Sequence, residues 1–307
     1  MSISANPPNS PVLRTRLASF GLIEVLGSDA RSFLHNQLSN DLLQLAPDQA
    51  QWSAYCSPKG RMLAGFLAWC ATPERIYLAC DRALVPGLVK RLRMFVLRAK
   101  AVIDDASERF EFSGVIGEAG DHVPLRLALT DDAMRIDLPA VDGQRRALIV
   151  APVPAPAAAA SAVSGDETVW KAMMIAAGEV WLTPATQDQF VPQMVNFDAI
   201  GGINFKKGCY PGQEVVARAH YRGAVKRRMY PARVKGTASA GQPLFAGGAD
   251  AQECGMIANA SVLADGFCAV LAVVPIQSRL EANIHLAAVD GPALVFLDLP
   301  YTIPESP

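Results

Sequence analysis

The sequence predicts an α+β fold in which helices pack on antiparallel sheets, followed by a C-terminal region of short strands. The first observation is that segments typical of strands alternate with two amphipathic helical patterns across residues 13–150. The second is a Pro- and Ala-rich stretch at 151–161, too low in complexity to form a core, which marks a boundary. The third is the change, from Lys226 onward, to short strands and turns, which favours closure into a small barrel.

Local patterns predict each element of the N-terminal part. Residues 13–26 carry enough Leu, Ile and Val for one or two strands, and Ser28 or Asp29 caps a helix that follows over 30–38. A second amphipathic helix is predicted at 81–95, with its apolar residues on one face. Further strands are predicted at 52–56, 62–69, 75–80, 101–103, 110–116 and 147–150.

The remainder of the chain follows the same reasoning. Helices are predicted at 169–177 and 213–218. Strands are predicted at 228–234, 253–258, 267–274, 283–287 and 293–297. These patterns predict an N-terminal α+β domain at 11–158, a middle α+β segment at 162–228 and a C-terminal β-barrel at 229–303.

Composition excludes several classes of protein. The 307 residues carry a formal net charge of -1, which gives no overall attraction to nucleic acid or anionic membranes. Residues 1–11 lack the apolar core of a signal peptide, and no apolar run approaches the ~18 residues of a membrane span. We therefore expect a cytoplasmic protein.

The six cysteines and four histidines are scattered through the sequence. No Cys-x-x-Cys pair and no His-x-x-x-His pair is present, so the pattern indicates neither a zinc site nor a disulfide framework. We expect reduced thiols and no intrinsic metal.

Cys209 is the cysteine with a distinctive setting. It follows Lys206 and Lys207, and Pro211 suits the first turn of a helix that begins just after the cysteine. A helix N-terminus and two lysines would favour thiolate over thiol, which predicts a nucleophile, a redox centre or a metal ligand. The alternative is that Cys209 is a small buried apolar residue, as many free cysteines are.

Four segments together resemble one family. They are 29–41 (DARSFLHNQLSND), 57–63 (SPKGRML), 190–196 (FVPQMVN) and 201–218 (GGINFKKGCYPGQEVVAR). The chain resembles the YgfZ-type folate-binding proteins of the aminomethyltransferase (glycine-cleavage T-protein) superfamily across nearly its whole length. The Lys-Gly-Cys-Tyr-x-Gly-Gln-Glu element is the most specific part of this resemblance.

The resemblance implies a fold and a function. The fold is a three-domain, T-protein-like ring with ferredoxin-like α+β units and a small C-terminal β-barrel around a central channel that accepts tetrahydrofolate. The function is support for assembly or repair of iron–sulfur clusters in client enzymes, including tRNA-modifying ones. Partners would be folate and these clients or other assembly factors, whereas direct binding of nucleic acid is not expected.

The resemblance also implies site residues. Cys209 and Lys207 are the predicted catalytic residues. Residues predicted to contact the folate are Gln37, Asn40, Asp41, Lys59, Arg61, Arg98, Trp181, Gln193, Asn196, Gln213 and Glu214. Many of them have a structural alternative: helix capping for the Asn40 segment, solvated charges for Lys59, Arg61 and Arg98, and a core position for Trp181.

Two departures from the family pattern bear on activity. Relatives that transfer an aminomethyl carbon carry an aspartate where this chain has Leu63-Ala64-Gly65, so the carboxylate that would orient a substrate amine is missing. Many relatives carry Glu-Ala-Gly where this chain has Ala176-Ala177-Gly178, and Glu179 follows. The open alternatives are a folate-dependent aminomethyltransferase or demethylase and a folate-binding interaction module without chemistry.

Overall fold

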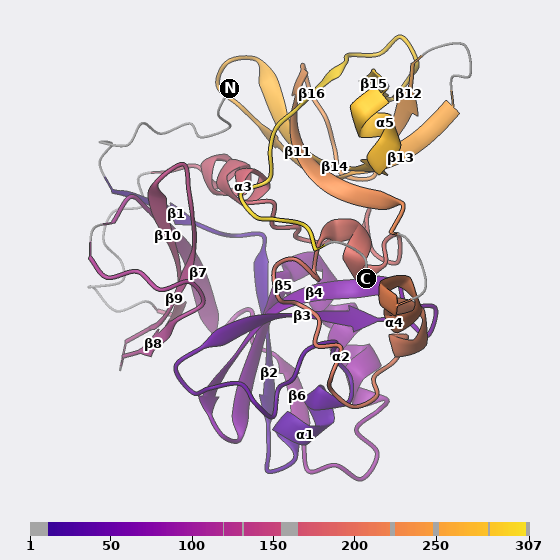
Figure 1. Ribbon diagram of the computed structural model, residues 1–307. Helices are drawn as coiled ribbons and strands as arrows, with labels where there is room; N and C mark the ends of the chain where they lie inside the picture. The colour runs from indigo at the N-terminus through magenta and orange to yellow at the C-terminus, as the bar shows by residue number, and fades with distance from the viewer. Residues whose placement is uncertain are drawn as a thin grey trace.

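A computed structural model describes residues 12–118, 120–130, 132–154, 165–221, 225–247, 252–281 and 283–304. Its strands form three antiparallel sheets, two of five strands and one of six. Short helices pack against the sheets and between them (Figure 1). The predicted α+β class is confirmed.

The first sheet has the strand order β3-β4-β5-β2-β6. Its strands are β2 (Phe20–Leu26), β3 (Ala50–Cys56), β4 (Met62–Thr72), β5 (Arg75–Asp81) and β6 (Val102–Asp105). Helices α1 (Ala30–His35) and α2 (Val85–Arg93) flank it, with the short helix η1 (Arg82–Leu84) before α2. Helix α1 ends earlier than predicted, and Pro86 separates the predicted helix 81–95 into η1 and α2 by starting a new first turn.

The second sheet has the order β1-β7-β10-β9-β8. Its strands are β1 (Leu13–Arg16), β7 (Phe110–Ile116), β8 (Leu127–Leu129), β9 (Met134–Val141) and β10 (Gln144–Pro152). Strands β8 and β9 were not predicted, because β8 is short and β9 contains Pro139 beside charged residues. The low-complexity stretch begins at the end of β10, and its part from residue 155 to 161 lies outside the described residues.

The third sheet is the predicted C-terminal barrel, with the order β15-β12-β13-β14-β11-β16. A bridge between His285 and Ala293 brings the two edge strands together, so that the sheet is nearly closed around its own core. Strand β12 and helix α5 (Ile276–Glu281) were not predicted. The strands are β11 (Arg227–Lys235), β12 (Pro243–Ala246), β13 (Gln252–Val262), β14 (Phe267–Pro275), β15 (Ile284–Leu286) and β16 (Leu294–Phe296).

Helix α3 (Glu167–Ala176) lies between the second sheet and the barrel (Figure 1). The Trp170 ring is fully buried against Gly114 of β7, where a Cβ atom would lie 2.2 Å from the ring. On the barrel side, Ser261 of β13 donates a hydrogen bond of 2.8 Å to the carbonyl of Thr168. The helix therefore joins two parts of the molecule that have no strands in common.

Two short helices follow α3, namely η2 (Pro192–Val195) and α4 (Gln213–Tyr221). After β16 the C-terminal segment runs back from the barrel toward the first sheet (Figure 1). There the hydroxyl of Tyr301 donates to the carbonyl of Gly178 at 2.8 Å. Among the described residues, no helix has the length and apolar character needed to cross a membrane.

Candidate functional site

Cys209 is the exposed cysteine of the chain, and the other five are buried. Burial raises the pKa of Cys56 to about 12 and that of Cys80 well above its usual value, and it also raises the pKa values of Cys70, Cys254 and Cys268. These five thiols are protonated and enclosed at neutral pH, which makes them inert. The alternative of a buried, structural Cys209 is therefore wrong.

Lys207 anchors the segment that carries Cys209. Its ammonium donates to the carbonyls of His35 at 2.7 Å and Leu38 at 3.0 Å, which lie at the C-terminal end of α1. This end of a helix leaves carbonyls without partners and favours a cation. Lys207 is 8% exposed, and burial lowers its pKa to about 8, although Asp41 and Cys209 oppose the shift.

A second contact holds the segment against the turn that joins β3 to β4. Gly212 has φ +80°, and a Cβ atom there would lie 2.5 Å from the carbonyl oxygen of Ser57 and 2.7 Å from the Cα of Gly60. Helix α4 begins after this glycine, so Pro211 lies in a turn rather than in the first helical turn as predicted. The helix begins at Gln213 as predicted, so Cys209 lies four residues before it, outside the first turn where the helix dipole acts most strongly.

A third contact comes from aromatic rings. Phe205 stacks on His220 of α4, with ring centroids 3.8 Å apart and planes inclined by 10°. Tyr221 meets the edge of the same Phe205 ring at 6.2 Å. Both ends of the segment 205–212 are therefore fixed, and Cys209 lies exposed between them.

Three predicted folate ligands lie beside Lys207, after α1. The Asn40 amide donates to the carbonyls of Trp52 at 2.9 Å and Gly201 at 2.7 Å. Asp41 accepts from the backbone N–H of Leu43 at 2.9 Å, and its carboxylate lies 3.0 Å from Nδ1 of His35. These contacts are the capping and turn roles that formed the alternative for this segment. Gln37 has a buried side-chain oxygen with no partner in the described part of the chain.

Four more predicted ligands surround the contact between Gly60 and Gly212. Lys59 and Glu214 are exposed, and Gln213 is partly buried at the start of α4. Arg61 is exposed and donates to the carbonyl of Gln189. Seven of the predicted folate ligands thus lie after α1, in the β3–β4 turn or at the start of α4, the three places that border the Cys209 segment.

The other four predicted ligands lie elsewhere. Arg98 is exposed after α2. The buried amides of Gln193 and Asn196 donate to the carbonyls of Val216 and Met229, at 2.7 and 2.8 Å, and thereby hold α4 and β11 to η2. Trp181 is stacked on Phe20, with centroids 4.3 Å apart. These amide nitrogens have a structural role, whereas the side-chain oxygens of Gln193 and Asn196 are buried without a partner among the described residues.

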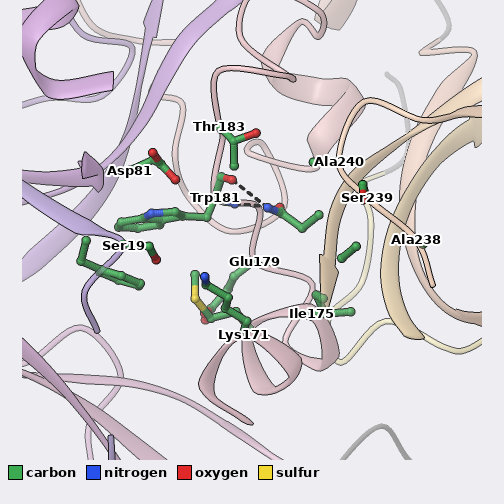
Figure 2. Close-up of a pocket in the computed structure, with 14 residues that line it drawn as sticks. Ser19, Asp81, Lys171, Ile175, Glu179, Trp181, Thr183, Ala238, Ser239 and Ala240 are labelled. Atoms are coloured by element: carbon green, nitrogen blue, oxygen red, sulfur yellow. Dashed lines mark hydrogen bonds between the residues drawn. The ribbon is translucent and has the colours of Figure 1, made fainter. Parts of the chain in front are cut away.

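Two cavities lie where the parts of the molecule meet. The first, named here the α3 cavity, has a volume of about 270 Å³ and lies between the first sheet, α3 and the barrel (Figure 2). The second, named the central cavity, has a volume of about 200 Å³ and is lined from the first sheet, the second sheet and the C-terminal segment. Cys209 lines neither cavity, so the expectation that folate lies against this thiol has no support in the structure.

Trp52 and Tyr301 lie in the wall of the central cavity, as do Ala177 and Glu179 at the end of α3. Glu179 is 3% exposed and receives two hydrogen bonds from Arg146, of 2.7 and 3.1 Å. Its carboxylate is neutralised by this ion pair and is not a free partner for the N–H groups of a pterin. The departure at 176–178 is therefore not fully compensated by Glu179.

No group of three or more His, Cys, Asp or Glu side chains in the described residues is arranged to hold a metal ion. In the stretch 63–65, which lacks the aspartate expected in aminomethyl-transferring relatives, Ala64 is fully buried in β4.

Comparison with known proteins bears directly on the family. No family model matches the chain. A protein of Enterobacter sp. (strain 638) named tRNA-modifying protein YgfZ is 30% identical, over 99% of this chain and 100% of that protein. The chain belongs to the YgfZ family. A protein of the same name from Vibrio atlanticus (strain LGP32) is 28% identical over 96% of this chain and 94% of its own. An uncharacterized protein of Haemophilus influenzae is 34% identical over 215 residues, 70% of this chain and 71% of that protein.

The fold of this YgfZ-family chain is that of the glycine-cleavage T-proteins. The crystal structure of glycine cleavage system aminomethyltransferase T from Bartonella henselae superposes with a TM-score of 0.70 and covers 94% of this chain and 86% of that chain. The two sequences are 14% identical, so this likeness concerns the fold. The predicted T-protein-like architecture with a C-terminal barrel is confirmed.

Sequence reasoning named Ala177 and Glu179 but missed the other residues that line the central cavity. Trp52 was read as part of a strand, and Tyr301 lies in a C-terminal segment without regular structure. Arg146 lies just before the predicted strand 147–150, and nothing in its neighbourhood in the sequence points to Glu179. One usable signal was present: the family's carboxylate position at 176–178 immediately precedes Glu179.

Proposed function

We propose that this protein is a cytoplasmic, tetrahydrofolate-binding accessory factor that supports the assembly or repair of iron–sulfur clusters in client enzymes, tRNA-modifying enzymes among them, through the Cys209 thiol. Membership of a family whose named members are tRNA-modifying proteins supports the client class. The signature around Cys209 supports the role of the thiol.

The observation that carries this proposal is the contrast between Cys209 and the other cysteines. The family signature singles out the one thiol that is exposed, while burial keeps the remaining five protonated. An exposed thiol beside the Lys207 ammonium is accessible to a client protein, and the fixed segment 205–212 presents it in a defined position. The thiol acts outward, toward a partner, rather than into a cavity.

One cysteine does not make a cluster site. Iron–sulfur clusters are normally held by four protein ligands, and no group of three or more His, Cys, Asp or Glu side chains in the described residues, at Cys209 or elsewhere, is arranged to hold a metal. Any cluster that contacts Cys209 must therefore share its ligands with a client or with a second copy of this chain. This favours transient support of a client over storage of a cluster.

The central cavity is the proposed folate site. It has the apolar wall and aromatic ring that small-molecule sites usually have, and three separate parts of the chain contribute to it. Trp52 and Tyr301 would hold a pterin ring by packing, and tetrahydrofolate would supply one-carbon or redox chemistry when bound. Because Arg146 already pairs with Glu179, shape rather than a charged hydrogen bond would decide binding.

Replacement of Cys209 by serine tests the proposal. In cells that lack their own copy of the protein, Cys209→Ser should reduce the modified nucleoside made by a cluster-dependent tRNA-modifying enzyme to the level of the deletion, measured by mass spectrometry of digested tRNA. Alkylation of the folded wild-type protein should label Cys209 and leave the other five thiols unlabelled.

The matched control is Cys254→Ser, which changes a buried thiol of the barrel and should retain full support. Full support by Cys209→Ser would refute the thiol mechanism and leave a folate-binding module without chemistry. The T-protein fold does not by itself favour aminomethyl transfer, because the stretch 63–65, where aminomethyl-transferring relatives are expected to carry an aspartate, contains no carboxylate.

A further inference from the structure

The α3 cavity has no part in the proposed function. It shares Glu179 with the central cavity and no other lining residue. At ~30 Å³ for each water molecule, a volume of about 270 Å³ has room for about nine waters, and hence for a ligand of similar size. Ser19, Phe20 and Asp81 of the N-terminal part face α3 and the barrel residues Ala238, Ser239 and Ala240 across it (Figure 2).

A buried hydrogen-bond donor faces this cavity without a partner. Trp181 is 6% exposed, and Asn259 holds its backbone through two hydrogen bonds of 3.0 and 2.8 Å. Its ring stacks on Phe20, so the indole is fixed in place. The Nε1 atom has no hydrogen-bond partner among the described residues, and in Figure 2 it lies on the side of the ring toward Asp81. Buried donors are seldom left unpaired, so this position suits an acceptor on a ligand.

A carboxylate with a spare oxygen lies beside that donor. Asp81 accepts a hydrogen bond of 3.0 Å from the backbone N–H of Ala83 through Oδ1. Its other oxygen accepts none from the part of the chain that the structure describes. Burial raises the pKa of Asp81 and Glu167 adds to the shift, while the Ala83 N–H and the Lys171 charge oppose it without cancelling it, so a further cation beside the spare oxygen would restore part of the lost hydration.

A cation completes the set. Lys171 of α3 lines the same cavity, with its ammonium 3.4 Å from Glu167, which also accepts from the backbone N–H of Ser19 at 3.2 Å. This leaves the ammonium with protons to donate to a ligand. Glu179, the remaining charged group in the wall, has both oxygens bound to Arg146.

We propose that the α3 cavity binds a free α-amino acid with a medium-sized apolar side chain. The ligand's ammonium lies on the spare oxygen of Asp81, and its carboxylate accepts from Nε1 of Trp181 and from Lys171. The side chain lies against the apolar floor formed by Met174 and Ile175. Each charged end of the ligand thus meets a wall group of opposite character.

Isothermal titration calorimetry of the whole chain tests this with three probes that carry the same isobutyl group. L-Leucine should bind saturably. 4-Methylpentanoate, which lacks the amine, and 3-methylbutylamine, which lacks the carboxylate, should each bind at least about tenfold more weakly, because each leaves one charged wall group unpaired. Equal binding of either analogue would overturn the proposal, as would the absence of saturable leucine binding to the folded protein.

Two variants assign the contacts. Asp81→Asn keeps an oxygen that can accept from the Ala83 N–H but removes the charge. It should weaken the binding of leucine about tenfold and leave the binding of 4-methylpentanoate unchanged. Trp181→Phe keeps the ring against Phe20 but removes the N–H, and it should weaken leucine about threefold or more.

The matched control for Asp81→Asn is Asp265→Asn, which changes an exposed aspartate of the barrel. This variant should bind leucine as the wild type does. Leucine binding unaffected by Asp81→Asn would overturn the proposal. Tetrahydrofolate binding should be unchanged in Asp81→Asn, because Asp81 does not line the central cavity, so this proposal and the folate proposal fail independently.

Discussion

A single buried ammonium positions the segment that carries the exposed thiol. Lys207 satisfies two carbonyls at the end of α1 and one of its own segment, that of Gly208 at 3.1 Å, so three acceptors depend on one side chain. The Lys207 ammonium also lies 4.7 Å from the centre of the Tyr210 ring, which adds a cation–π attraction. An arginine at this position would spread its donors over a flat, rigid fork, which does not suit three carbonyls around one point.

Stability should therefore depend on pH through Lys207. The folded state holds this proton less tightly than the unfolded chain, since the pKa falls from its usual 10.5 to about 8, and stability should rise with pH between these two values. We expect the unfolding free energy of the wild type relative to Lys207→Met to increase by about 2 kcal/mol from pH 7 to pH 9.5, measured by urea unfolding.

The control is Lys206→Met, which removes an exposed neighbouring ammonium and should differ from the wild type by the same amount at both pH values. A difference between wild type and Lys207→Met that does not change with pH would show that the ammonium is not desolvated on folding.

At the scale of elements, the Cys209 segment is a connection held between α1, the β3–β4 turn and α4. The two glycines of its signature differ in what they require. Gly208 has only His35 near the position of a Cβ atom, at 3.8 Å, whereas Gly212 combines φ +80° with backbone atoms at 2.5 and 2.7 Å. The second glycine is therefore the one whose lack of a side chain allows turn and segment to meet.

Gly212→Ala should destabilise the protein by about 2–3 kcal/mol and reduce its support of client enzymes, because the added methyl group displaces the segment from the turn. Guanidinium unfolding measures the first effect. Gly236→Ala is the matched control: it has a similar φ of +87° and no atom within 4 Å, so it should cost about 1 kcal/mol, for the backbone alone. Equal losses in the two variants would contradict the proposed close contact.

At the scale of the whole molecule, the parts meet around the central cavity. The buried pair of Arg146 and Glu179 joins the second sheet to the end of α3, and Arg146 also donates to the carbonyl of Pro139 at 2.8 and 3.0 Å. Tyr301 closes the same region from the C-terminal segment. Removing one member of such a buried pair typically lowers the free energy of unfolding by about 3–5 kcal/mol. The pair therefore fixes the position of the parts, and the cavity lies between them.

Ala140→Trp should block the central cavity. Ala140 is exposed at the end of β9 and lines the cavity, so a large ring fits there without entering the core. We expect tetrahydrofolate to bind at least about tenfold more weakly, by calorimetry, with stability within ~0.5 kcal/mol of the wild type. The control Ala128→Trp changes an exposed alanine of β8 that lines neither cavity, and this variant should bind tetrahydrofolate as the wild type does. Unchanged binding in Ala140→Trp would place the folate elsewhere.

The sequence alone determined the α+β class, the C-terminal barrel and most strands, and it singled out Cys209 as a candidate, because hydrophobic periodicity, turn residues and a short signature are local properties. It missed β8, β9, β12 and α5, which are short or broken by polar residues and proline and owe their structure to neighbours.

Only the tertiary structure decided which cysteine is open, that Lys207 is anchored at α1, and that Glu179 is already paired with Arg146. It also separated the thiol from both cavities, although the family signature suggested one shared site. The physical reason is that burial, desolvation and ion pairing depend on residues far apart in the chain, such as 146 and 179 or 35 and 207, whose contacts no local pattern encodes.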